Sequence, residues 1–83
     1  MIKTIPRITH LQYAVLREFR HWSRPSVAHC NLEIQITSPA FYQLIGRLCD
    51  GGLLRKSLHP YTRYKCSDEA VEQMNAAREF YRE

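Results

Sequence analysis

Residues 37–54 constrain this chain most, because they carry a helix start signal, an apolar stripe and a helix stop signal in order. The Ser38 hydroxyl can accept a backbone N–H at the helix start, with Thr37 beside it, and Pro39 suits the first helical position. Gly51 or Gly52 can adopt the left-handed conformation that ends a helix. This stretch therefore predicts a helix over residues 38–50.

The predicted helix has two unlike faces. An apolar stripe with spacing i, i+3, i+4 and i+7 consists of Phe41, Leu44, Ile45 and Leu48. The opposite face has few charges and several hydrogen-bonding groups: Ala40, Tyr42, Gln43, Gly46, Arg47 and Asp50. Because an α-helix fits the major groove of DNA, and Arg and Gln pair with guanine and adenine edges, we interpret this face as a DNA-reading surface.

Individual residues of that face have assigned roles and alternatives. Arg47 and Gln43 would contact bases, and Ser38 at the helix N-terminus would hold a phosphate. Arg47 could instead form a salt bridge with Asp50 or Glu33, and Tyr42 could equally be half-buried under the hairpin that follows. Gly46 is unfavourable in mid-helix and would be explained by a close approach to DNA or to a neighbouring helix.

Two further helices are expected before this one. The first begins near Thr9 in a capping-box pattern and ends at Ser23-Arg24-Pro25. Its stripe is Ile8, Leu11, Val15, Phe19 and Trp22. The second would span residues 25–32, with an inner face of Val27, Cys30, Asn31 and Ile34. Apolar and polar residues alternate over residues 32–36, which favours a strand. The alternative is a helix that ends near residue 32 and is followed by an extended turn. We favour the helix and the turn, which would bury Ile34 and Ile36.

Residues 53–66 predict a basic hairpin with a turn at His59-Pro60-Tyr61, because proline fits a hairpin tip. Thr62, Tyr64 and Cys66 alternate with Arg63 and Lys65, as in a half-buried strand. The hairpin contains four cations and no acid: Arg55, Lys56, Arg63 and Lys65. We expect these cations to contact phosphates, although an ordinary solvated hairpin would carry the same pattern.

The last predicted element is a helix over residues 67–82, capped by Ser67 and acidic in its first turn. Its apolar face is broad: Ala70, Val71, Met74, Ala77, Phe80 and Tyr81. Part of that face should pack on the first helix. We expect Met74, Phe80 and Tyr81 to contact a second subunit, the alternative being that the whole face is monomer core.

Composition narrows the class of protein. Eighty-three residues make one domain, and residues 1–66 contain ten Lys/Arg against three acids, whereas residues 67–83 contain five acids against two Arg. The first part suits a polyanion. Three widely spaced cysteines without metal-ligand spacing indicate reduced thiols in a cytoplasmic protein. We expect no metal, no cofactor, no membrane span and, without a nucleophile elbow or phosphate-cradling loop, no enzymatic activity.

Two stretches resemble the PadR family of bacterial transcriptional regulators, within the wider MarR-like group. One is Ser38-Pro39 with Tyr42-x-x-Ile45-x-Arg47-Leu48-x-x-x-Gly52-Leu53-Leu54; the other is Tyr64-Lys65-Cys66-Ser67, similar to the family's Tyr-x-Leu-Thr. The resemblance implies a winged helix-turn-helix: mainly α, with a three-helix core, a two-stranded wing and a C-terminal helix. It also implies a homodimer that places the third helix in the major groove and the wing on the backbone. Gln43 stands where the family usually has proline.

These observations predict a double-stranded DNA-binding transcriptional regulator formed by residues 1–83. The predicted DNA contacts are Ser38, Pro39, Tyr42, Gln43, Arg47, Arg55, Lys56, Arg63 and Lys65. The alternative is a winged-helix protein-interaction module without specific DNA binding, favoured by the acidic and apolar C-terminal helix.

Overall fold

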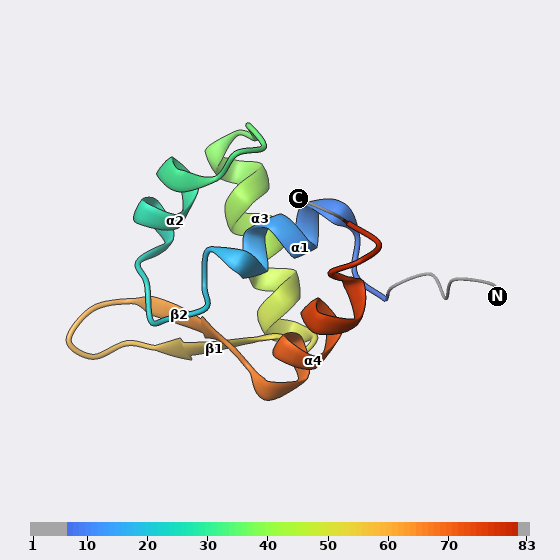
Figure 1. Cartoon of the computed structure of the whole chain (residues 1–83). Coiled ribbons are helices and arrows are strands. Elements are labelled where there is room, and N and C mark those ends of the chain that lie inside the picture. The colour runs from blue at the N-terminus through green and yellow to red at the C-terminus, as the bar shows by residue number, and fades with distance from the viewer. Residues whose placement is uncertain (1–6, 82–83) are drawn as a thin grey trace, which may run out of the picture.

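The computed structural model describes residues 7–81, and within them it contains four helices and one two-stranded antiparallel hairpin. The helices are α1 (His10–Arg17), α2 (Pro25–Asn31), α3 (Ser38–Asp50) and α4 (Asp68–Ala77), and the strands are β1 (Leu54–Ser57) and β2 (Arg63–Cys66). Figure 1 shows α3 running from α2 down to the base of the hairpin, with α1 and α4 on one side of it. The order of elements is the one that the sequence predicts.

The core lies where α1, α3, β2 and α4 meet, and it is built from the apolar stripes of those elements. Its fully buried side chains include Val15, Leu16, Phe19, Phe41, Ile45 and Leu48. The rings of Phe19 and Phe41 stack with centroids 6.4 Å apart, and Tyr64 meets Phe19 edge-on at 5.9 Å. The predicted α3 stripe is therefore confirmed, except that Leu44 is only half-buried.

Helix α1 begins as predicted and ends earlier than predicted. Thr9 and Gln12 form the capping box, with N···O distances of 2.9 and 3.1 Å. The helix ends at Arg17, because the following segment pairs with β2 instead: Ser23 and Tyr64 exchange backbone hydrogen bonds of 3.0 and 2.9 Å. Trp22 consequently leaves the predicted buried stripe and is 38% exposed.

The segment before α3 consists of helix α2 followed by an extended connection, as we favoured, and not of a strand. Residues 32–36 contain no strand, and Ile34 and Ile36 are half-buried in an extended connection. The predicted inner face of α2 is wrong, since Val27 is 51% exposed and Cys30 and Asn31 are also exposed.

Helix α2 instead packs through Ala28 and His29. Ala28 is buried, and the His29 ring stacks on Phe41 at 4.7 Å. The His29 Nε2 atom also lies 2.8 Å from the Ile36 carbonyl oxygen. The stacking of His29 on Phe41 turns this side of α2 toward the core. Apolar spacing predicted another face because it does not count histidine as a core residue.

The ends of α3 are fixed by backbone geometry. Thr37, and not Ser38, is the N-cap, since its hydroxyl accepts from the Ala40 N–H at 3.4 Å and its own backbone is extended. At the other end, Gly52 has φ +77° and donates to the Cys49 carbonyl, while the Leu53 N–H donates to the Leu48 carbonyl at 2.8 Å. This pair of bonds is a Schellman motif, which aims the chain directly into β1.

Helix α4 is shorter than predicted, and residue 82, to which the prediction extended, lies outside the described residues. The Ser67 cap is confirmed, with the Ala70 N–H 3.2 Å from its hydroxyl. Its Oγ also donates to the Gly52 carbonyl at 2.6 Å, which joins the start of α4 to the end of α3. Between residues 7 and 81, no helix is both long and apolar enough to cross a membrane.

Two of the three residues predicted to contact a second subunit are occupied within the chain. Met74 is only 6% exposed, because it packs into the core beside Cys66. Tyr81 donates its hydroxyl to the Ile8 carbonyl at 2.7 Å and stacks on His10 at 5.1 Å. The prediction of intersubunit contact is therefore wrong for Met74. Tyr81 is mostly engaged in contacts within the chain, whereas Phe80 is 43% exposed.

Candidate nucleic-acid interface

The outer face of α3 presents its polar groups to solvent. Tyr42 is 48% exposed, and Gln43, Gly46 and Arg47 are also exposed. These residues share one side of the helix, since Gly46 and Arg47 lie three and four positions after Gln43, and Gly46 lies four positions after Tyr42. Within the described part of the chain, no ion pair joins Arg47 to Asp50 or Glu33. The guanidinium group predicted to reach a base is therefore not held in the predicted alternative salt bridge.

Gly46 leaves an open spot in the middle of this face. A Cβ atom built at Gly46 would find no atom within 4 Å. Close packing against a neighbouring helix, one of the two explanations suggested by the sequence, is therefore not found among residues 7–81. The other explanation, a close approach to DNA, stays a prediction.

The N-terminal turn of α3 contains the first two predicted contact residues. Ser38 and Pro39 are exposed. Because Thr37 takes the capping role, the Ser38 hydroxyl is not used to satisfy the helix start. The unpaired N–H groups of a helix N-terminus favour an anion, so this turn suits a phosphate group.

Strand register sorts the hairpin cations onto two faces. Arg55 pairs directly with Lys65, and Ser57 pairs with Arg63. Side chains on neighbouring strands that pair directly lie on the same face, and alternate residues of one strand share a face. Arg55, Arg63 and Lys65 therefore form one basic surface, which we call the wing face.

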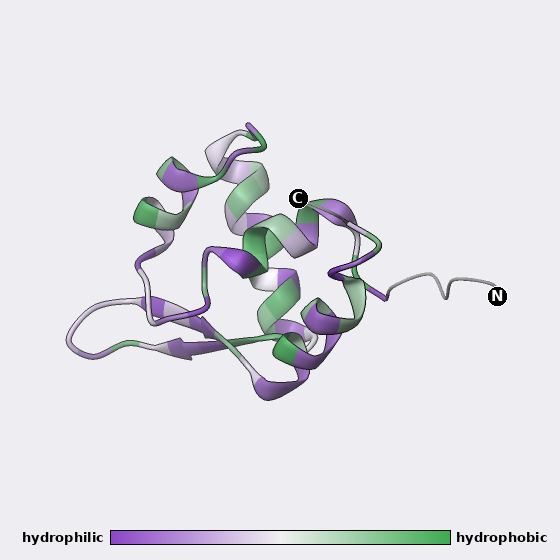
Figure 2. Cartoon of the chain, viewed as in Figure 1, coloured by the Kyte–Doolittle hydropathy of each residue, from purple (hydrophilic) through white to green (hydrophobic). Residues whose placement is uncertain are grey.

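Lys56 departs from the predicted set of four. It pairs with Tyr64 and lies on the opposite face of the hairpin, with its Nζ atom 5.9 Å from the centroid of the Tyr64 ring. Figure 2 shows hydrophilic colouring on both strands of the hairpin. Lys56 therefore lies on the face of the hairpin opposite the wing face.

On the wing face, two like charges oppose each other across the hairpin, which does not favour folding. Arg55 and Lys65 carry like charges at directly opposed positions, an arrangement that destabilises a hairpin. Among the described residues, neither is neutralised by an acid within ion-pair distance. Residues 38–66 together contain five Lys/Arg and one acid, Asp50. An external polyanion would relieve this repulsion.

Three residues that the sequence interpretation did not assign to the site lie beside the wing face. The guanidinium carbon of Arg63 is 5.2 Å from the Trp22 ring centroid and 5.9 Å from that of Tyr61. The guanidinium carbon of Arg24 also lies over the Tyr61 ring, 3.9 Å from its centroid. We call Trp22, Arg24, Tyr61 and Arg63 the aromatic–arginine cluster. It links the turn end of the hairpin to the segment that follows α1.

The sequence contains the aromatic residues of this cluster, but their local patterns indicate other roles. Trp22 continued the apolar spacing of the first helix, and Tyr61 stood in a turn. The Ser23–Tyr64 bridge brings these positions together, and pairing between residues 41 positions apart is not visible in local periodicity.

The thiols of this region are poor nucleophiles. Burial raises the pKa of Cys66 to about 11, against a smaller opposing effect of the Arg20 charge, and the Cys66 thiol donates to the Leu16 carbonyl at 3.1 Å. Burial also raises the pKa of Cys49. A raised pKa lowers the fraction of thiolate, which is the nucleophilic form of cysteine, at neutral pH. Across residues 7–81, no group of three or more His, Cys, Asp or Glu side chains is arranged to hold a metal ion.

Comparison of the chain with protein-family models, with curated proteins and with solved structures found no match.

Proposed function

We propose that this chain is a winged helix-turn-helix protein of the PadR type that binds double-stranded DNA as a cytoplasmic transcriptional regulator. Helices α2 and α3 are the helix-turn-helix, and the hairpin is the wing. The observation that carries the proposal is the exposed polar face of α3 beside a wing face whose opposed cations have no carboxylate within ion-pair distance among residues 7–81. Such a combination supplies groups for base edges and groups for phosphates.

The proposed contacts divide by role. Gln43 and Arg47 contact base edges in the major groove, and Tyr42 lies beside them. Ser38 and Pro39, at the α3 N-terminus, lie against one phosphate. Arg55, Arg63 and Lys65 contact the phosphates next to the groove, with Arg24 at their border.

The test is a fluorescence-anisotropy titration of the full chain with genomic duplex fragments at several salt concentrations. Replacement of a base-contacting residue (Arg47→Ala or Gln43→Ala) should lower specific binding about tenfold or more while nonspecific binding changes little. Arg55→Gln should weaken binding to all duplexes and reduce the salt slope by about one.

A matched control removes one cation elsewhere. Arg78 follows α4 and belongs to neither α3 nor the hairpin. Arg78→Gln should leave the affinity for DNA within about twofold of the parent, because screening limits charge effects beyond about 10 Å. Equal losses for Arg55→Gln and Arg78→Gln would mean that binding follows net charge and not the wing face.

A protein-interaction module is the second candidate, favoured by the surface of α4. Val71 is 45% exposed and Phe80 is 43% exposed, and the first turn of α4 carries Asp68 and Glu69. This function would replace the first if no duplex binds even at low salt. Homodimer formation, proposed here through Phe80 and Val71, is measured by light scattering on the parent and on Phe80→Ser.

A further inference from the structure

The two aromatic rings of the aromatic–arginine cluster are open to solvent. Trp22 is 38% exposed and Tyr61 is 42% exposed, although rings of this size usually contribute to a core or an interface. Trp22 continues the apolar spacing of the first helix, yet α1 ends at Arg17 and the ring stays outside the core. The core therefore makes little use of either ring.

The cluster and the wing face form one continuous surface. Ser23 and Tyr64 exchange backbone hydrogen bonds as an antiparallel pair. Because side chains alternate between the two faces of a sheet, Trp22 and Arg24 lie on the face opposite to Ser23. Arg63 alternates with Tyr64 in the same way on β2, and its guanidinium carbon lies 5.2 Å from the centroid of the Trp22 ring. Exposed rings and cations thus share one side of the hairpin.

The guanidinium groups of the cluster are held by rings and not by acids. The guanidinium carbon of Arg24 lies 3.9 Å from the Tyr61 centroid. The Nε atom of Arg63 is buried and has no hydrogen-bond partner among the described residues. Within residues 7–81, neither arginine forms an ion pair with a carboxylate. Both charges are therefore available to an external anion beside open aromatic surface.

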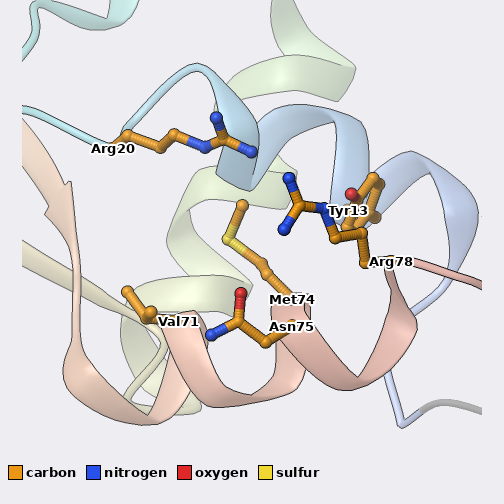
Figure 3. Close-up of a pocket in the computed structure, with 6 residues that line it drawn as sticks. All are labelled: Tyr13, Arg20, Val71, Met74, Asn75 and Arg78. Carbon is orange, nitrogen blue, oxygen red and sulfur yellow. The ribbon is translucent and has the colours of Figure 1, made fainter. Parts of the chain in front are cut away.

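Arg20 lies four positions before Arg24 and has different surroundings. Figure 3 shows Arg20 and Arg78 at a hollow between α1 and α4 that is also lined by Tyr13, Val71, Met74 and Asn75. The Tyr13 ring is 2% exposed, so it offers no open face there. Arg20 carries the same charge as Arg24 in the same segment without an exposed ring beside it, which makes it a matched control.

We propose that the aromatic–arginine cluster binds single-stranded DNA, with an unpaired base stacked on the exposed rings and its phosphates against the two guanidinium groups. Rings beside cations are the combination that binds single strands, and every base has a face that can stack. A duplex keeps the faces of its bases inside the stack and would offer the cluster only phosphates. The choice of DNA over RNA rests on the proposed function of the adjoining wing face, whereas the stacking does not.

The test uses the fluorescence of Trp22, the single tryptophan of the chain. Stacking of a base on the indole ring quenches its emission. The full chain is titrated with oligothymidine of about eight nucleotides, a length that one single-strand-binding domain covers. An abasic strand of the same length supplies the phosphates without the bases. We expect oligothymidine to quench the emission and to bind about tenfold or more tightly than the abasic strand.

Substitution of the second ring separates stacking from charge. Tyr61→Leu should weaken the binding of labelled oligothymidine, measured by anisotropy, about tenfold or more, and Tyr61→Phe should stay within about twofold of the parent because it keeps the ring. Tyr61 is exposed, so both variants should fold, which circular dichroism checks. Phe80→Leu removes an equally exposed ring after α4 and should leave the affinity unchanged. Tyr61→Leu keeps every cation of the wing face and should change the affinity for duplex DNA less than about threefold.

Substitution of the cations locates the phosphates. Arg24→Gln should weaken oligothymidine binding and reduce its salt slope by about 0.7, the value for one phosphate contact on a single strand. Arg20→Gln should leave both the affinity and the slope close to those of the parent. Equal effects of the two substitutions would indicate diffuse attraction to a basic protein and would overturn the assignment to the cluster.

Three further results would overturn the proposal. Equal affinity for oligothymidine and the abasic strand would show that the bases have no role. Oligouridine that binds about tenfold more tightly than oligothymidine would assign the cluster to RNA. A chain that binds duplex DNA but shows no quenching by oligothymidine would lack the single-strand site. Quenching by oligothymidine in a chain that binds no duplex would support this proposal and count against the function proposed for α3.

Discussion

Gly46→Ala separates the stability of α3 from its proposed contact with DNA, because the two should change in opposite directions. Gly46 lies inside α3, and a Cβ there has no atom within 4 Å. Alanine in an exposed helix interior is more favourable than glycine by about 1 kcal/mol. For a domain of this size, Tm should rise by about 4–8 °C.

The effect on DNA binding should be unfavourable. Gly46 lies on the same face as Gln43 and Arg47, so an added methyl group would meet the groove that these two residues contact. A helix held away from the groove floor loses base contacts, each worth about 1–3 kcal/mol, or about tenfold or more in specific affinity. Nonspecific affinity, which depends on phosphates, should change little.

The assays are chemical and thermal unfolding followed by circular dichroism, and anisotropy titration with the best duplex fragment. Asn75→Ala on α4 is the matched control, since it also raises helix propensity at an exposed position but lies away from α3. It should stabilise without a loss of DNA affinity. A Gly46→Ala protein that is more stable and binds its specific duplex unchanged would refute the proposed close approach. A less stable Gly46→Ala protein would refute the account of an open helix face.

Other predictions concern the joint between α3 and α4 and the buried thiol. Gly52→Ala should destabilise by about 1–2 kcal/mol in urea unfolding, since φ +77° is costly for alanine although the nearest atom to its Cβ is 3.9 Å away. Ser67→Ala should cost about 1–2 kcal/mol by the same measurement, because it removes both the α4 cap and the 2.6 Å bond to the Gly52 carbonyl. In mass-spectrometric alkylation at pH 8, exposed Cys30 should react fastest, and Cys66 only as the chain unfolds. As pH rises from 9 to about 11, the unfolded chain ionises Cys66 before the folded chain does, so stability should fall over this range by urea titration; a Cys66→Ala variant should lack this component.

Local signals predicted the elements that are defined by local chemistry. Pro39 and the Gly51-Gly52 pair placed both ends of α3 correctly, because caps depend on residues within one turn. The Thr9 capping box and the Ser67 cap were predicted for the same reason. The predicted N-cap, Ser38, is one position after the observed one, Thr37, because the hydroxyl of either residue satisfies the sequence pattern.

Features that depend on long-range pairing were not predictable in this way. The periodicity of α1 continues to Trp22, yet the helix stops at Arg17 because Ser23 pairs with Tyr64. The α2 face was wrong because stacking of His29 on Phe41 decides it. In the candidate site, Gln43, Gly46 and Arg47 are exposed as the polar pattern predicts, and Tyr42, for which half-burial under the hairpin was an alternative, is exposed too. Separation of Lys56 from the other cations required the strand register.

The hairpin also has a consequence for self-association of the chain. In the described sheet, β2 lies between β1 and the segment around Ser23, so β1 is left as the free edge. A free edge can pair with the same strand of another copy and start an aggregate, and charged side chains discourage that pairing. Arg55 and Lys56 lie on β1, where two copies would bring four positive charges together. Selection for colloidal stability alone would therefore retain cations on this strand, even in a relative that had lost any partner for its wing face.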